Sequence, residues 1–153
     1  MIRMAKLTDY ALLLLFTLAR EKGVLHNARD LARAVSLPLP TVSKLLKALL
    51  QGGLLASRRG VKGGYELARE PATISLADII RAVEGPIGLT ECSTHPGECE
   101  RAPGCPVGKS MRSVSTELRH AFERLNLSDL LLPPGEAPLL DPALLVSSTR
   151  RSS

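Results

Sequence analysis

The sequence predicts a mainly α-helical chain with one small β-hairpin, and three observations lead to this class. The 153 residues suffice for one compact domain with appendages, but not for two full-sized domains. Aromatic residues make up only 3% and Trp is absent, so aliphatic side chains must fill the interior. Apolar residues recur mainly at helical spacing, and strand-like alternation surrounds only the glycine-rich turn at 59–64.

Three helices are expected in the N-terminal part, at residues 9–22, 28–35 and 40–51. Thr8 and Asn27 are suitable N-caps for the first two, and a very short strand is expected at 24–25 between them. Ser36-Leu37-Pro38 breaks the chain before the third helix, where Pro40 fits the first turn because its missing N–H is not needed there.

A hairpin and a fourth helix follow the third helix. Leu54–Arg58 and Tyr65–Ala68 read as two strands joined by the basic turn at 59–64. Ser75 and Asp78 form a capping box that opens a helix reaching about Val83. A helix-turn-helix followed by such a hairpin, or wing, makes residues 1–84 a winged helix-turn-helix.

The C-terminal half has three expected parts. Residues 85–106 hold Cys, Pro and Gly without periodicity, so this loop needs an external organiser such as a metal. Within 107–132, apolar residues from Val107 to Leu125 alternate at four and three, which predicts a dimerisation helix. The alternative is an amphipathic helix packed on its own domain. Ser128-Asp129 is expected to cap a last short helix, and 133–153 is expected to be disordered.

Positive charge is concentrated in the N-terminal part, where a polyanion would bind. Residues 1–70 carry 12 Lys/Arg against 5 Asp/Glu, a net +7, whereas the rest carries a net −2. A recognition helix reads the DNA major groove through exposed polar residues near its N-terminus, and a basic wing follows the backbone or enters a narrow minor groove. The alternatives are an ordinary amphipathic surface helix and a solvated basic turn. The expected DNA contacts are Pro40, Thr41, Ser43, Lys44, Lys47, Arg58, Arg59 and Lys62.

Three cysteines lie within 14 residues, at Cys92, Cys99 and Cys105. Thiolates are soft ligands that suit iron-sulfur clusters or zinc. A structural zinc site usually has four ligands with closely spaced pairs, and no C-x2-C occurs here. His95 is the nearest local fourth ligand, although a loop His is more often solvated. Free buried thiols and a metal-free thiol-disulfide switch remain alternatives.

The N-terminal apolar run at 11–15 does not predict a signal peptide or a membrane span. Asp9 precedes the run, no small-residue cleavage site follows, and about 18 apolar residues would be needed to cross a bilayer. A cytoplasmic protein is expected, in which thiols stay reduced. The sequence has no nucleophile–base pair, phosphate-binding glycine loop or paired carboxylates in a plausible pocket, so an enzyme is not expected.

Four features together resemble the bacterial Rrf2 family over residues 1 to about 130: Leu7-Thr8-Asp9-Tyr10-Ala11, the turn at 36–38, Arg59-Gly60-Val61-Lys62-Gly63-Gly64-Tyr65 and the three cysteines. The stretch at 79–92 looks most like the branch that regulates the SUF iron-sulfur assembly system. The resemblance implies a homodimer on double-stranded operator DNA, with long helices crossing between two winged units. It also implies an iron-sulfur cluster held near the dimer interface by Cys92, Cys99 and Cys105.

The resemblance also concerns the fourth ligand. IscR-like members use a His three residues after the third cysteine, where this chain has Gly108. NsrR-like members use an acidic residue of the partner subunit near its N-terminus, and Asp9 matches it. Two-iron and four-iron clusters both remain open, as do the signal, the operator sequence and which form binds DNA. The expected function is repression of SUF genes; the alternatives are a nitric oxide or redox sensor of the same fold and a metal-binding scaffold protein.

Overall fold

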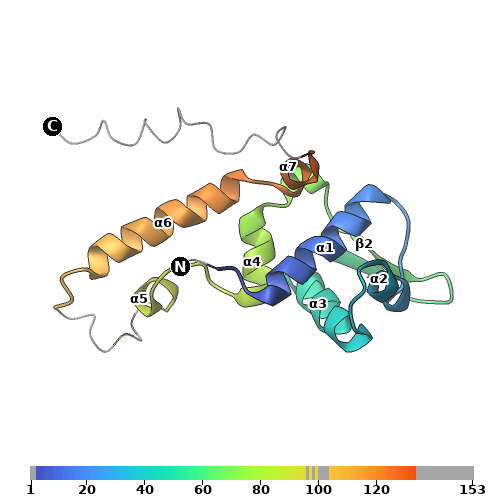
Figure 1. Ribbon diagram of the computed structural model, residues 1–153, viewed down its shortest axis with the longest axis horizontal. Coiled ribbons are helices and arrows are strands. Elements are labelled where there is room, and N and C mark those ends of the chain that lie inside the picture. Colours follow the sequence, from blue (N-terminus) through green and yellow to red (C-terminus); the bar gives the residue numbers. More distant parts are fainter. Residues whose placement is uncertain (1–2, 96, 98, 100–103, 134–153) are drawn as a thin grey trace.

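The computed structural model describes residues 3–95, 97, 99 and 104–133. Its elements run in the order α1 (Lys6–Arg20), α2 (Ala28–Ala34), α3 (Leu39–Gln51), β1 (Leu55–Arg58), β2 (Gly64–Leu67), the 3-10 turn η1 (Pro71–Thr73), α4 (Leu76–Glu84), α5 (Glu91–Thr94), α6 (Gly108–Arg124) and α7 (Leu127–Leu131) (Figure 1). The predicted class, mainly α-helical with one small hairpin, is confirmed. The turn η1 and the short helix α5 were not predicted. The expected tail beyond Pro133 lies outside the described residues.

Aliphatic side chains from α1, α2, α3, β1 and α4 form one core, as the low aromatic content requires. Helices α1 and α3 each contribute four residues from one face at helical spacing. These are Ala11, Leu14, Leu15 and Leu18 from α1, and Val42, Leu45, Leu46 and Leu49 from α3. Because its apolar face is fixed in this core, α3 must turn its polar face outward.

Truncating Leu46 tests the contribution of this core. Leu46 is fully buried, so Leu46→Ala is expected to lower the free energy of unfolding by about 2–5 kcal/mol through lost burial and the cavity left behind. Val61→Ala is the matched control, because Val61 is fully exposed and its truncation should change stability by less than about 0.5 kcal/mol. Urea unfolding without DNA measures both, and equal losses would contradict the packing described.

Two of the predicted helix caps are confirmed. The Asn27 side chain accepts a hydrogen bond from the Asp30 backbone N–H at 2.9 Å at the start of α2. At the start of α4, the Asp78 N–H donates to Ser75 Oγ at 3.0 Å and the Ser75 N–H donates to the Asp78 carboxylate at 3.1 Å. Both motifs satisfy backbone donors within three residues, which explains why local sequence reveals them.

Two other predicted caps are wrong. Helix α1 begins at Lys6, so Thr8 lies inside the helix, where it is fully buried and its hydroxyl donates to the carboxylate of Glu84. Helix α7 is capped by Asn126 instead of Ser128, in a capping box with Asp129. The Thr8 hydroxyl donates to Glu84, which is far away in the sequence. At α7, Asn126 lies three residues before Asp129, which is the spacing of a capping box.

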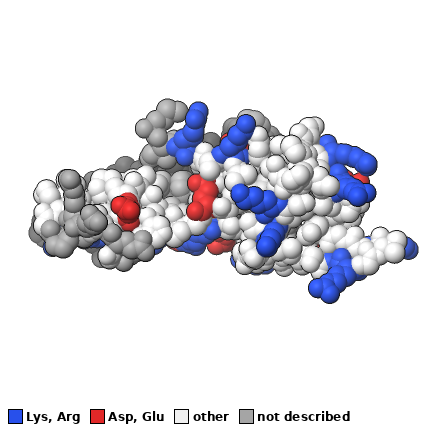
Figure 2. All heavy atoms as spheres, turned by 90° about the horizontal axis from the view of Figure 1, so that it is seen from below, with Lys and Arg blue, Asp and Glu red and all other residues white. Residues whose placement is uncertain are grey.

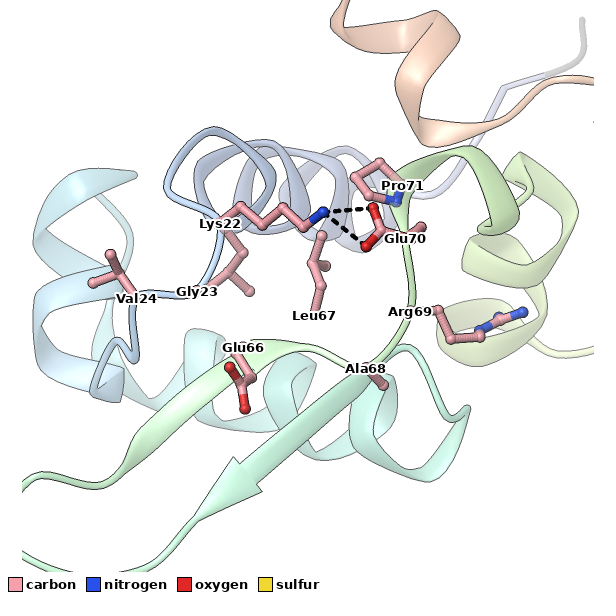
Figure 3. Close-up of a pocket in the computed structure, with 10 residues that line it drawn as sticks. Lys22, Gly23, Val24, Glu66, Leu67, Ala68, Arg69, Glu70 and Pro71 are labelled. Atoms are coloured by element: carbon pink, nitrogen blue, oxygen red, sulfur yellow. Dashed lines mark hydrogen bonds and ion pairs between the residues drawn. The ribbon is translucent and has the colours of Figure 1, made fainter.

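The wing is an antiparallel pair of strands with the register Leu55↔Leu67 to Arg58↔Gly64. The expected short strand before α2 is a single bridge one residue later, in which the His26 N–H donates to the Tyr65 carbonyl at 3.1 Å and the Tyr65 N–H donates to the His26 carbonyl at 2.8 Å. Beyond the C-terminal end of β2, Lys22 Nζ pairs with the Glu70 carboxylate at 2.7 Å over a small pocket (Figure 3). The base of the wing is therefore tied to the end of α1.

Helix α6 extends away from α1, α2 and α3 and packs on α4 and α5 (Figure 1). Ser115 is buried on its inner side, whereas Val107 and Val114 of the predicted seam are 58% and 49% exposed. Met111, Leu118, Phe122 and Leu125 are half-buried. Part of the apolar seam thus lies on the surface of the single chain.

The N-terminal apolar run belongs to the core of this fold. Ala11, Leu14 and Leu15 are fully buried in α1 against the other helices. Across the described part of the chain, no helix combines the length and apolar character needed to span a membrane.

Candidate functional site

Helix α3 presents a polar face on the side opposite its buried residues. Pro40, Ser43, Lys44 and Lys47 are exposed, and Thr41 is half-buried. Positions 40, 44 and 47 recur at helical spacing and therefore form one stripe. Neither lysine forms an ion pair with any acid among the residues that the structure describes. The structure thus places these predicted residues together, with two free positive charges.

The three basic wing residues differ in their surroundings. Arg58 lies on β1 and its guanidinium pairs with the Glu66 carboxylate of β2 at 3.0 Å. Arg59 and Lys62 lie in the turn, are exposed, and have no acidic partner in the described ranges. The cross-strand pair partly neutralises Arg58, so Arg59 and Lys62 are the stronger anion-binding groups of the wing.

Two arginines of α2 extend the basic surface, and they were not among the predicted DNA contacts. Arg29 and Arg33 are exposed and line an open groove of about 440 Å³ together with Ser36 and residues 37–39. The first helix of a helix-turn-helix crosses the DNA backbone, where such side chains contact phosphates. Their i,i+4 spacing, outside the apolar positions of α2, was the available signal.

Basic side chains are spread over the half of the molecule that carries α2, α3 and the wing (Figure 2). The other half shows fewer of them on this face. The face turned to the reader in Figure 2 is the lower side of Figure 1, where α3 lies. This uneven distribution agrees with the charge difference between the two parts of the sequence, and it marks the winged unit as the side for a polyanion.

The three cysteines lie along the segment between α4 and α6, all half-buried and none in a disulfide. Cys92 is in α5, and its Sγ is 3.2 Å from Thr90 Oγ1. Cys105 precedes α6, where a Cβ built on Gly108 would be 3.6 Å from the Cys105 Sγ. A side chain at position 108 would therefore adjoin this sulfur, and glycine leaves that place open.

The cysteines are not gathered into a ligand group within one chain. Within residues 3–95, 97, 99 and 104–133, no three His, Cys, Asp or Glu side chains lie close enough together to hold a metal ion. Asp9 is exposed in the first turn of α1. His95 is exposed, with its Nδ1 3.0 Å from the hydroxyl of Thr94. The donor set, three free thiols, fits an iron-sulfur cluster in chemistry.

Two buried hydroxyls hold the chain just before the cysteines. Thr8 and Ser115 are the buried polar residues of the described chain. The Thr8 hydroxyl donates to Glu84, at the end of α4, and the same carboxylate oxygen accepts the Ala5 N–H at 3.0 Å. Ser115 Oγ of α6 accepts the Leu89 N–H at 3.0 Å. Residues 84–89 are therefore pinned to α1 on one side and to α6 on the other.

The profile of the Rrf2 family, described as "Iron-dependent Transcriptional regulator", matches residues 4–133. The chain belongs to the Rrf2 family. This match spans the winged unit, the cysteine segment and both C-terminal helices, so the resemblance drawn from the motifs is confirmed at the level of the family.

Individual Rrf2 relatives agree with this assignment. The chain is 32% identical over 126 residues to the HTH-type transcriptional regulator NsrR of Geobacillus kaustophilus, covering 81% of this chain and 86% of that protein. Among solved structures, CymR, the global cysteine regulator of B. subtilis, superposes with a TM-score of 0.66 at 27% identity, covering 86% of this chain and 97% of CymR. The IscR of T. potens has a TM-score of 0.65 at 27% identity, covering 94% and 96%.

These Rrf2 relatives are DNA-binding transcriptional regulators and not enzymes, so this protein is a transcriptional regulator of the same family. The winged helix-turn-helix class predicted from the sequence is confirmed by the similarity to CymR and IscR. Helix α3 and the wing correspond to the elements through which winged helix-turn-helix proteins contact DNA.

Proposed function

We propose that this protein is a homodimeric, cytoplasmic transcription factor whose operator affinity depends on an iron-sulfur cluster held by Cys92, Cys99 and Cys105, and that it represses SUF cluster-assembly genes. The observation that carries the proposal is the set of three free, half-buried thiols on one segment between α4 and α6. The family description as iron-dependent regulators supports it. The DNA contacts are those of α3 and the wing, joined by Arg29 and Arg33.

Asp9 of the partner subunit is the fourth ligand in this proposal. Gly108 has no side chain to offer beside Cys105, and His95 points its Nδ1 at its neighbour. Asp9 is exposed in α1, so it is accessible to a second subunit. A bound cluster would supply a cross-link among these side chains; both two-iron and four-iron clusters accept such a donor set.

The exposed apolar side chains of α6 support the homodimer. Val107, at the N-cap of α6, and Val114 are exposed and lie seven residues apart, thus on one helix face. A second copy of α6 would cover this stripe. The proposed dimer contact therefore adjoins the cysteine segment, because this segment ends where α6 begins.

The buried hydroxyls provide a route from the cysteine segment to the DNA-binding unit. A change in the cluster alters the segment that follows residue 89, and the contacts of Thr8 and Ser115 transmit that change to α1 and α6. The cysteine segment and the DNA-binding unit are coupled in this way when an element between them has two arrangements, and when the cluster and the DNA each favour one arrangement over the other.

Replacing Thr8 by its isostere tests this route. Thr8→Val keeps the volume and removes the hydroxyl that binds Glu84, so it is expected to reduce the ratio of operator affinities between cluster-loaded and cluster-free protein at least about threefold. Thr17→Val is the control, because Thr17 bonds only its own helix at Leu13. Fluorescence anisotropy on both forms gives the ratio. An unchanged ratio in Thr8→Val, with the cluster retained, would contradict the route.

The proposal is tested by anaerobic purification, followed by the visible spectrum and by iron and sulfide analysis of wild type and Cys99→Ala. A brown, sulfide-containing wild type and a colourless variant are expected. A wild type that stays colourless after reconstitution would overturn the cluster.

A metal-free thiol switch is the second candidate. It is favoured by the absence of a metal-ligand group among the described residues and by the similarity to CymR, which has also been solved in an oxidised form in Staphylococcus aureus at 25% identity. Under this alternative, oxidation of the colourless protein forms a Cys–Cys cross-link that changes operator affinity. Non-reducing mass spectrometry of the oxidised protein distinguishes the two candidates.

A further inference from the structure

Val61 occupies the apex of the wing in a closed four-residue turn. The Gly63 N–H donates to the Gly60 carbonyl at 3.0 Å, which leaves Val61 and Lys62 at the tip. Gly60 has a φ of +112°, a conformation that an L side chain rarely adopts. Val61 has a relative exposure of 107%, the highest of the exposed large apolar residues in the described chain. An apolar side chain therefore lies at the tip of the wing, where the basic surface projects into solvent.

The backbone of the tip is tightly closed. A Cβ on Gly63 would come within 2.2 Å of the Arg58 carbonyl oxygen, so the two arms of the turn approach as closely as glycine permits. Valine is branched at Cβ and has restricted rotation about χ1, so it loses little entropy on contact. Arg59 and Lys62 flank it without acidic partners in the described chain, and both are free to bind phosphates on either side of a groove.

A wing tip of this shape, inserted into a minor groove, would bring an apolar group to the floor of that groove. A·T and G·C pairs both present hydrogen-bond acceptors there, but G·C adds the guanine N2 amino donor. Valine has no acceptor for this donor. Placing Val61 over a G·C pair thus strips water from an amino group and leaves it unpaired, a penalty that an A·T pair does not incur.

We propose that Val61 determines sequence specificity by excluding G·C pairs beneath the wing. The inference rests on the proposed DNA binding and assigns this specificity to one apolar side chain. Arg59 and Lys62 contribute affinity for the DNA beneath the wing, and Val61 contributes the discrimination between A·T and G·C pairs there. The cost of an unpaired donor predicts that G·C beneath the wing weakens binding about 5- to 10-fold.

The test uses a duplex selected from a random pool by the full-length protein, with the base pairs under the wing located by hydroxyl-radical footprinting. Those pairs are then made A·T, G·C or inosine·C, since inosine differs from guanine only in lacking the amino group. Wild type is expected to bind the A·T and inosine·C duplexes equally and the G·C duplex about 5- to 10-fold more weakly.

Val61→Thr keeps the branched shape and adds an oxygen that accepts from the amino group. It is expected to reduce the G·C discrimination below about twofold, with the salt dependence unchanged. The matched control, Lys62→Gln, should weaken binding to all three duplexes alike and lower the salt slope by about 0.9. Equal wild-type affinities for A·T and G·C, or discrimination that persists in Val61→Thr, would overturn the role of Val61. Failure to bind any duplex would overturn the proposed DNA binding as well.

Discussion

Replacing Lys44 and Lys47 together by Gln is expected to weaken operator binding at least about 30-fold, at roughly 1 kcal/mol for each lost contact. Both lysines are exposed on the outer face of α3 and have no acidic partner among the described residues. Their charges are therefore available to DNA and are not committed to the fold. Because each phosphate contact contributes about 0.9 to the slope of log K against log salt, that slope should fall by up to about 1.8.

Titrations from low to physiological salt measure both quantities on the same duplex. Lys109→Gln is the control: it removes one positive charge from the exposed surface of α6, far from α3, and should leave the slope unchanged. The unfolding free energy of the double variant should stay within about 0.5 kcal/mol of wild type, since neither lysine packs in the core. A slope unaffected by the double replacement would mean that α3 does not contact the DNA.

Gly63→Ala is expected to weaken DNA binding about 30-fold by displacing the turn that carries Arg59 and Lys62. The added Cβ would lie 2.2 Å from the Arg58 carbonyl oxygen and 2.9 Å from the Gly60 carbonyl oxygen, both backbone atoms that cannot rotate away. The strands must separate, and both basic side chains lose their placement together. Most of the fold should survive, because the turn is exposed and outside the core.

Gly23→Ala serves as the matched control for the wing. Gly23 has a φ of +81°, so alanine strains the chain locally by about 1 kcal/mol, but its Cβ would meet no atom within 4 Å. Circular dichroism and urea unfolding compare the stabilities, and anisotropy compares the DNA affinities. Gly23→Ala should keep its affinity. If Gly63→Ala bound DNA as tightly as Gly23→Ala, the wing would not take part in binding.

Local motifs account for the parts of the fold that the sequence predicted correctly. The caps at Asn27 and Ser75 close bonds over three residues, and the hairpin closes over a glycine-rich turn. Thr8 failed as a cap because its partner, Glu84, is 76 residues away. No local pattern can reveal such a contact.

The candidate site also has parts that local sequence predicts and parts that depend on contacts between distant residues. Helical periodicity placed Lys44 and Lys47 on the outer face of α3 correctly, since the buried stripe fixes the opposite side. The pairing of Arg58 with Glu66 depends on strand register, which the sequence leaves undefined. Arg29 joins the basic surface only because the turn after α2 brings it beside the start of α3. The role of the cysteine segment as a cluster site stays a proposal, because a complete ligand set requires the cluster itself and a second subunit.

The dependence of DNA binding on the cluster is tested by an anaerobic titration of one operator duplex with cluster-loaded protein, cluster-free protein and Cys99→Ala. We predict that the loaded and cluster-free forms differ in affinity at least about fivefold, the lower range of allosteric coupling, and that Cys99→Ala matches the cluster-free form. Equal affinities for the two wild-type forms, measured on protein whose iron and sulfide contents differ, would contradict it.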